Sequence, residues 1–155
     1  MTLIPPGPLD SGLEQLSEDE CRWLLSETTV GRVAFVVDGF PVVLPVNYRF
    51  ISAEPGPWIV FRSQPGHAVD RAPDEVAFEI DGVDYDQHQG WSVLCSGALH
   101  HLDDDEISQL MQRFDPDPWP QWGTTSWLAI RPRSLSGRRL RGLDHEWEFP
   151  SEAYL

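Results

Sequence analysis

Arg62 and Ser63 are candidates to bind a phosphate group. They stand at the end of a predicted strand, immediately before Gln64-Pro65-Gly66-His67. An arginine fork, a hydroxyl group and free backbone amides at the start of a helical turn are the groups that hold a terminal phosphate in proteins. The alternative is an arginine that pairs with one of the many surface carboxylates of this chain, because such ion pairs are common. The residues themselves leave both interpretations open.

Trp91, which precedes Ser92 at the start of another predicted strand, could stack on a planar ligand or anchor the core, and composition favours the core. His100 and His101 resemble a metal pair, but adjacent side chains of a strand point to opposite faces, so the two are not expected to share one ion. The acidic run 103–106 is interpreted as a solvated helix start. No hydrolase or Walker motif occurs in the sequence.

Six or seven short strands are predicted to position these residues. Residues 31–37 and 42–50 flank Asp38-Gly39, a strong hairpin signal. Pro45 in the second of these strands predicts an edge position or a bulge, because proline has no N–H for the ladder. After a turn at 54–57, the remaining strands are expected over 58–62, 76–80, 91–99, 127–130 and 136–140, with the polar segment 81–90 as a connection.

Two helices and one helical turn are predicted between the strands. Ser17 and Glu20 form a capping box, which opens a helix that runs to about residue 26 and has Cys21, Leu24 and Leu25 on one face. A second capping pair, Asp103 and Glu106, precedes a helix with Ile107, Leu110, Met111 and Phe114 at helical spacing. A short helical turn is expected over 66–72. Many short antiparallel strands with few helices favour a closed or partly closed barrel.

The composition of the 155 residues fits one domain, with an extended N-terminal arm over 1–16, a barrel domain over 17–141 and an acidic, aromatic tail over 142–155. The net charge of -14 makes nucleic acid and membrane surfaces poor partners. No apolar run is long enough to span a bilayer, and the first residues do not resemble a signal peptide. Cys21 and Cys95 form no CxxC pair and are expected to be reduced, buried thiols of a cytoplasmic protein.

The order of several segments resembles the pyridoxamine 5'-phosphate oxidase-related family. Each segment is a weak signal, but their order and spacing across residues 17–140 are fairly specific. The segments that carry the resemblance are Leu24-Leu25, Val30-Gly31-Arg32-Val33-Ala34-Phe35, Pro41, Pro45-Val46-Asn47-Tyr48, Val60-Phe61-Arg62-Ser63, Gly66, Val76-Ala77-Phe78-Glu79-Ile80-Asp81, Gly90-Trp91-Ser92-Val93, Gly97, Ile130-Arg131-Pro132 and Ser136-Gly137-Arg138-Arg139.

This resemblance implies a fold that is mainly β with short helices (α+β), a six- to seven-stranded antiparallel split β-barrel of the FMN-binding type. It also implies a homodimer that binds FMN, or in some relatives the deazaflavin F420 or haem, between the subunits. Matching positions would place Arg62 and Ser63 on the cofactor phosphate and Asn47 beside the ring system, while Trp91 and Ser92 would come from the strand that completes the pocket.

One departure from the family pattern concerns the phosphate site. Relatives usually carry a lysine one or two positions after the residue that matches Gly66, whereas this chain continues with His67 and Ala68 and contains no lysine at all. A protonated His67 could partly substitute for that lysine, and Arg71 could reach the site.

The resulting functional expectation is an FMN-dependent oxidoreductase that acts on a small organic molecule. The alternative is a non-catalytic barrel that binds F420, haem or another ligand at a degraded flavin site. A haem protein would need a histidine aimed into the pocket, and the candidates are His67, His88, His100 and His101. Oxidation of pyridoxamine phosphate itself is not expected, because no basic cluster for a second phosphate is found, and no residue is assigned a catalytic role.

Overall fold

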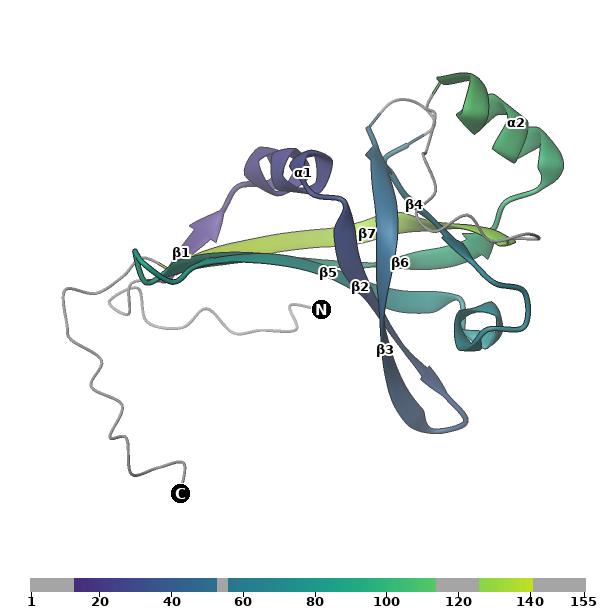
Figure 1. The fold of residues 1–155 in the computed structure, drawn as a ribbon, viewed down its shortest axis with the longest axis horizontal. Coiled ribbons are helices and arrows are strands. Elements are labelled where there is room, and N and C mark those ends of the chain that lie inside the picture. Colours follow the sequence, from purple (N-terminus) through teal and green to yellow (C-terminus); the bar gives the residue numbers. More distant parts are fainter. Residues whose placement is uncertain (1–12, 53–55, 114–125, 141–155) are drawn as a thin grey trace.

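The computed structural model describes residues 13–52, 56–113 and 126–140, which form seven strands, two α-helices and one short 3-10 helix. Figure 1 shows how they are arranged. In chain order they are β1 (Leu13–Leu16), α1 (Glu18–Glu27), β2 (Val30–Val37), β3 (Phe40–Ile51), β4 (Trp58–Ser63), the 3-10 helix η1 (Ala68–Arg71), β5 (Glu75–Asp84), β6 (Gln89–His101), α2 (Asp104–Arg113) and β7 (Ser126–Leu140).

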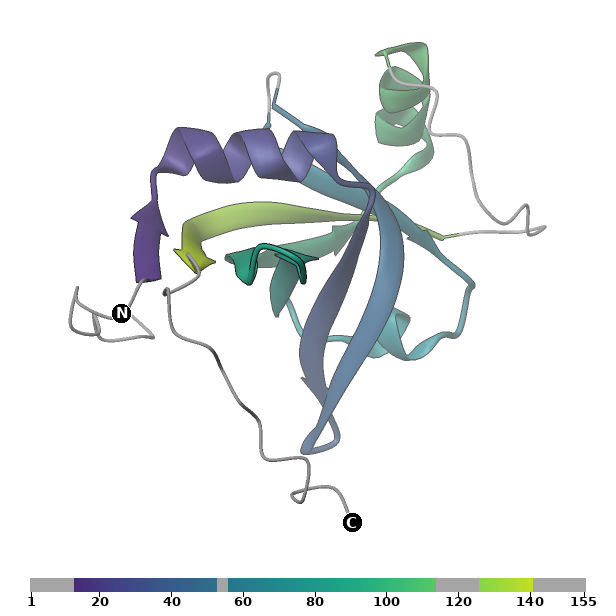
Figure 2. The ribbon, with the colours of Figure 1, turned by 60° about the vertical axis from the view of Figure 1, so that its left-hand side comes forward.

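The strands form a closed antiparallel ring. Their order in the sheet is β1-β7-β4-β3-β2-β5-β6, and an additional pairing of β7 with β6 closes the ring. β7 pairs with β6 along nearly its whole length, while its other edge is shared by β4 over its first part and by β1 over its last part. In Figure 2, α1 lies along one side of this ring. The architecture confirms the predicted split β-barrel.

Both predicted helix caps are present. The Ser17 hydroxyl accepts a hydrogen bond from the Glu20 amide (3.2 Å), and the Glu20 carboxylate accepts one from the Ser17 amide (2.8 Å). Asp103 and Glu106 make the same reciprocal pair, both at 2.9 Å. Each pair satisfies two amides that a helix start leaves without partners, which explains why α1 and α2 begin where the sequence predicts.

The β2–β3 hairpin also follows its local sequence. Asp38 and Gly39 adopt positive φ angles of 51° and 81°, the conformation that an Asp-Gly hairpin turn requires. In the described residues, the stretch of β3 that contains Pro45 pairs with β2 alone, so this proline lies at a sheet edge as predicted. The hairpin projects from the body of the barrel (Figure 1).

Three predictions about the strands were wrong. The two strands predicted at the end of the domain are one continuous strand, because a one-residue register shift accommodates Pro132: Gly97 pairs with Pro132 and Ser96 with Ser134. The extra residue, Arg133, forms an ion pair with Glu75. Such a bulge lets a proline without an N–H sit inside a paired strand.

The predicted connection 81–90 is mostly strand, because β5 and β6 continue to a short turn at 85–88. There the Asp84 carboxylate accepts the amides of Asp86 and Gln87 at 3.0 Å each. Residues 13–16, assigned to the extended arm, form β1. The rest of the predicted arm, part of the turn at 54–57, Phe114 and the predicted tail lie outside the described residues.

Two hydrophobic clusters lie on the two faces of the sheet. The larger cluster fills the inside of the barrel with residues such as Val33, Phe61 and Phe78, and α1 contributes Cys21, Leu24 and Leu25 to it. The smaller cluster lies on the outside, and α2 covers it with Ile107 and Leu110. Its buried members are Ile51, Trp58, Val60, Leu102, Trp127 and Ala129. Cys21 and Cys95 are buried free thiols, as predicted. None of the helices in the described part of the chain is long and apolar enough to cross a membrane.

Two buried groups that lose a proton only at high pH, the Tyr48 hydroxyl and the Cys95 thiol, predict that the protein loses stability in alkaline solution. Tyr48 is 1% exposed, and burial raises its pKa to about 12; burial also raises the pKa of the Cys95 thiol to about 12. In the unfolded chain both groups lose their protons at lower pH, from about pH 9 to 10. Their contribution to stability is therefore fully present below pH 9 and is lost as the pH rises toward 12.

We expect the free energy of unfolding, measured with urea, to fall by on the order of 2 kcal/mol between pH 8.5 and pH 10.5. In Cys95→Ala the fall should be smaller than in the original protein, since the thiol no longer contributes to it. An equal fall in both proteins would show that Cys95 is not one of the groups responsible.

Candidate cofactor-binding site

The outer face of the barrel brings Asn47, Arg49 and Arg62 close to one another. Side chains alternate between the two faces of a strand, and Tyr48 and Phe61, which pair with each other, point into the inner core. Their neighbours on β3 and β4 therefore point outward. β3 and β4 are adjacent, and Arg49 pairs with Val60, two residues before Arg62 on β4. Two of the residues predicted to touch the cofactor, Asn47 and Arg62, thus share one face.

Two arginine–tryptophan pairs extend this face across β7. The Arg62 guanidinium lies 5.1 Å from the centre of the Trp127 ring, and the Arg131 guanidinium lies 4.8 Å from that of Trp58. The two tryptophans are only 8% and 7% exposed, so each provides a fixed apolar surface beneath an arginine. Cation–π contacts of this kind hold a guanidinium in place without neutralising its charge.

These arginines have no carboxylate partner in the described part of the chain. Arg32, by contrast, donates to Glu79 and Asp81 at 3.0 Å each. No described carboxylate lies within ion-pair distance of Arg49, Arg62 or Arg131. Among the described residues, Arg49 donates a hydrogen bond to the Tyr48 carbonyl at 3.1 Å. In a chain with 25 acidic residues, Arg49 and Arg62 are neighbouring positive charges on one face and suit an anion. Arg131 lies four residues along β7 from Trp127, the partner of Arg62, which corresponds to about 13 Å. The interpretation of Arg62 as one half of a surface ion pair finds no support here.

Trp58 also offers a hydrogen-bond donor on this face. Its indole nitrogen is buried and has no partner among the described residues. The ring contacts both Arg131 and His100, and the centre of the His100 ring is 4.7 Å from its own in an edge-on arrangement. A buried N–H without an acceptor is rare and costly in proteins, so its surroundings suit a group that accepts hydrogen bonds.

Ser63 and the loop after β4 differ from the phosphate cradle that the sequence suggested. Ser63 points to the opposite face from Arg62, and its hydroxyl donates to the Gln64 carbonyl at 3.3 Å. The Gly66 amide donates to the Asp70 carboxylate at 2.6 Å, and the His67 amide donates to the Gln64 carbonyl at 3.1 Å. These two amides are therefore occupied within the chain and are not free for a ligand.

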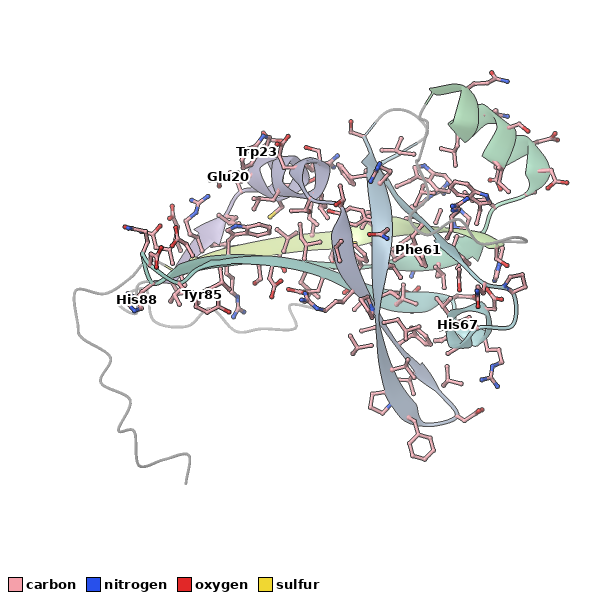
Figure 3. The ribbon with its side chains drawn as sticks, in the orientation of Figure 1. Glu20, Trp23, Phe61, His67, Tyr85 and His88 are labelled. Atoms are coloured by element: carbon pink, nitrogen blue, oxygen red, sulfur yellow. The ribbon has the colours of Figure 1, made fainter. Side chains whose placement is uncertain are left out.

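Trp91 and Ser92 lie away from this loop. Trp91 packs against the inner core and covers Gly82, where a Cβ atom would come within 2.6 Å of its ring. Ser92 is on the outer face but eight residues along β6 from His100, which corresponds to about 26 Å. Figure 3 shows the same separation. His67, in the loop after β4, lies at one end of the molecule, and Tyr85 and His88, in the turn that precedes β6, lie at the other. One chain does not bring Trp91 and Ser92 together with Arg62.

The four candidate histidines occupy separate environments. His67 is exposed on the loop, and His88 is exposed on the β5–β6 turn with a φ of 49°. His100 is half-buried against Trp58 and His101 is exposed, in line with the expected alternation. Burial lowers the pKa of His100; the Glu106 carboxylate opposes this shift, and the Arg131 guanidinium adds to it. His100 is the one that shares a face with Arg62.

Arg49, Arg131, Trp58 and Trp127 lie on this face but are not among the site residues predicted from the sequence. Arg49 could have been found from strand alternation alone, because it lies two residues after Asn47 in the predicted strand 42–50. Arg131 and the two tryptophans could not, because their positions depend on how β7 pairs with β4.

Sequence comparison relates the chain to one family. The sequence model of the pyridoxamine 5'-phosphate oxidase family matches residues 17–139. The uncharacterized protein Rv0080 of Mycobacterium tuberculosis is 29% identical over 129 residues, which make up 81% of this chain and 84% of that protein.

Solved structures share the fold described above. The FAD binding protein from Mycobacterium smegmatis is 29% identical, with a TM-score of 0.71, and the match covers 84% of this chain and all (100%) of that one. The FAD-binding protein from Mesorhizobium loti is 25% identical, with a TM-score of 0.63 and coverage of 82% and 97%. A conserved protein of unknown function from Corynebacterium diphtheriae, at 24% identity, 83% and 98% coverage and a TM-score of 0.71, shows the fold alone.

Proposed function

Because the chain belongs to the pyridoxamine 5'-phosphate oxidase family, we propose that it binds a flavin nucleotide whose phosphate lies against the arginines of the outer face. The observation that carries this proposal is Arg62, which is half-buried on Trp127 and has no carboxylate partner among the described residues. Arg49 and Asn47, on the neighbouring strand, would approach the same ligand. The donor set is arginine-rich and therefore suits phosphate oxygens.

The flavin would make the protein an oxidoreductase that acts on a small organic molecule. When bound, a flavin supplies hydride and electron transfer, while the protein orients the reactants and excludes water. We assign no side chain a role in acid–base catalysis, since the chemistry of the flavin does not require one. The buried thiols Cys21 and Cys95 suit a reducing compartment, and we place the protein in the cytoplasm.

Both FMN and FAD are compatible with this face. FMN carries one terminal phosphate, as the sequence resemblance implies, and FAD carries a diphosphate. The presence of Arg49 on the strand beside Arg62 would suit more than one phosphate oxygen. The relatives from M. smegmatis and M. loti, at 29% and 25% identity, are FAD-binding proteins.

A titration followed by flavin fluorescence tests the proposal. We expect FMN or FAD, added to the purified protein, to be quenched with saturation at low micromolar concentration, and the bound flavin to show a shifted absorbance spectrum. Riboflavin, which lacks the phosphate, is expected to bind at least about tenfold more weakly. Absence of saturable binding by FMN, FAD and riboflavin alike would contradict the flavin proposal, and F420 and haem would then be titrated in the same way.

We also propose that the functional unit is a homodimer. Val30, Val36 and Val43 lie on the outer face of β2 and β3 and are 57%, 54% and 60% exposed. An exposed apolar surface of this kind is typical of an interaction site. A second copy of the chain would also bring another Trp91 and Ser92 to the proposed cofactor, which one chain keeps away from Arg62.

A non-catalytic binding barrel is the second candidate function. The occupied amides of Gly66 and His67 and the lack of any lysine favour it, because they leave fewer groups for a terminal phosphate. This candidate predicts a bound flavin, F420 or haem that no nicotinamide nucleotide reduces and that exchanges no electrons with small organic acceptors. Stopped-flow absorbance of the loaded protein distinguishes the two functions.

A further inference from the structure

Asp70 occupies the position in the loop after β4 where the sequence suggested an anionic ligand group. Its carboxylate accepts the Gly66 amide at 2.6 Å, across a backbone turn in which Gly66 adopts a φ of +80°. The amide of Asp70 itself donates to the His67 carbonyl at 3.0 Å, so hydrogen bonds within the loop hold both its backbone and its side chain. η1 is anchored by Val69, which is 2% exposed in the main core. The Gly66 amide, which a ligand phosphate could otherwise contact, is therefore occupied by the Asp70 carboxylate.

The second oxygen of this carboxylate is buried without a hydrogen-bond partner among the described residues. No described arginine or histidine forms an ion pair with it, although His67 and Arg71 are close in sequence. An unpaired buried carboxylate oxygen is costly, so this arrangement is not what a purely structural loop would favour. Its negative charge acts on any anion that approaches the loop.

We propose that Asp70 is a specificity-determining residue of the proposed flavin site. Its carboxylate takes the Gly66 amide and keeps a terminal phosphate off residues 64–71, so that the ligand phosphate rests on Arg62 and Arg49 alone. This inference depends on the flavin proposal above. The family resemblance leads one to expect a lysine one or two positions after Gly66, whereas this chain has His67 and Ala68 there and the carboxylate of Asp70 two positions further on.

The class of ligand that this loop favours follows from the charge of the Asp70 carboxylate, which is held next to the Gly66 amide. Repulsion by a fixed carboxylate grows with the charge of the nearest ligand group. A phosphate monoester, as in FMN, carries close to two negative charges at neutral pH, whereas each phosphate of a diphosphate bridge carries about one. Asp70 therefore disfavours the terminal phosphate of FMN more than the bridging diphosphate of FAD.

Asp70→Asn tests this role, with Asp74→Asn as the matched control. The asparagine keeps the side-chain oxygen that accepts the Gly66 amide but removes the charge. Asp74 is an exposed aspartate four residues further on, and its backbone carbonyl, not its side chain, accepts the Leu99 amide. We expect the Kd for FMN to fall about tenfold in Asp70→Asn, the Kd for FAD to fall less, and the Kd for riboflavin to stay within about twofold.

Three results would overturn the proposal. They are an unchanged Kd for FMN in Asp70→Asn, an equal change for riboflavin, or the same gain in Asp74→Asn. Thermal unfolding of each variant checks that it folds, and Asp70→Ser replaces Asp70→Asn if the latter does not.

Inorganic phosphate separates failure of this inference from failure of the flavin proposal. If no flavin binds any of the proteins, the flavin proposal fails. The shift in Tm caused by 20 mM phosphate, roughly the concentration needed for a weak site, then decides the role of Asp70. A larger shift in Asp70→Asn than in the original protein and Asp74→Asn supports the exclusion of anions by Asp70. Equal shifts in all three proteins overturn it.

Discussion

Replacing Arg62 with glutamine is expected to raise the Kd for FMN and FAD roughly 10- to 100-fold and to leave riboflavin binding nearly unchanged. A charge-assisted hydrogen bond from an arginine to a phosphate contributes about 1.5–3 kcal/mol, and the glutamine removes the charge while keeping much of the length of the side chain. The effect should be large because Arg62 lies against the buried ring of Trp127 and is not committed to a carboxylate in the described residues. Fluorescence titration with the three ligands measures it.

Arg22→Gln is the control for the loss of one positive charge. Arg22 lies on α1 and pairs with Glu18 at 2.6 Å, and it belongs to neither the outer face of β3 and β4 nor the loop after β4. Its replacement should change the Kd for FMN by less than about twofold, since exposed charges at a distance are screened by salt. Equal losses in Arg62→Gln and Arg22→Gln would show that the net charge of the protein, and not a phosphate contact, governs binding.

Val43→Glu is expected to convert the proposed homodimer into a monomer. Val43 is 60% exposed in the single chain, so a glutamate there should leave the fold of the monomer intact. In a symmetric dimer, however, the substitution would bury two carboxylates, and an unpaired buried charge costs several kcal/mol. Light scattering coupled to size-exclusion chromatography should give twice the chain mass of 17.6 kDa for the original protein and the chain mass itself for the variant.

Trp23→Glu is the control for this substitution. Trp23 is 60% exposed on α1, and its replacement changes the charge of the protein by the same amount at a place outside both the β2–β3 surface and the start of β6. This variant should stay dimeric. A monomeric original protein, or a dimeric Val43→Glu, would refute the proposed interface. If Trp91 and Ser92 of a second copy complete the site, Val43→Glu should also weaken flavin binding.

The elements that the sequence predicted well are those whose boundaries depend on neighbouring residues. The caps at Ser17 and Asp103 satisfy their own helix amides, and the turn at Asp38-Gly39 depends on the backbone freedom of two residues. The continuity of β7 could not be predicted in this way. In the sequence, Pro132 predicts the end of a strand, and only the pairing with β6 provides the bulge that lets the strand continue.

The sequence identifies only some members of the candidate site, because the positions of the others depend on how distant strands pair. Arg62 was identified by its residue type, and its exposure on the outer face follows from alternation. Alternation also places Ser63 on the opposite face from Arg62, just as it separates His100 from His101. The hydrogen bond from the Gly66 amide to Asp70 could not be predicted, because it depends on the backbone conformation of the residues between them.

The position of β7 in the ring determines when this domain can fold during synthesis. β7 is the last described strand, yet it provides the partner edge for β1, β4 and β6, and Leu13 pairs with Leu140. While a ribosome is still making residues 126–140, these three strands have unpaired edges, which are prone to join other chains. Closure of the barrel must therefore be nearly the last event and must depend on contacts distant in sequence, which makes folding slow. The growing chain is most exposed to aggregation just before this strand leaves the ribosome.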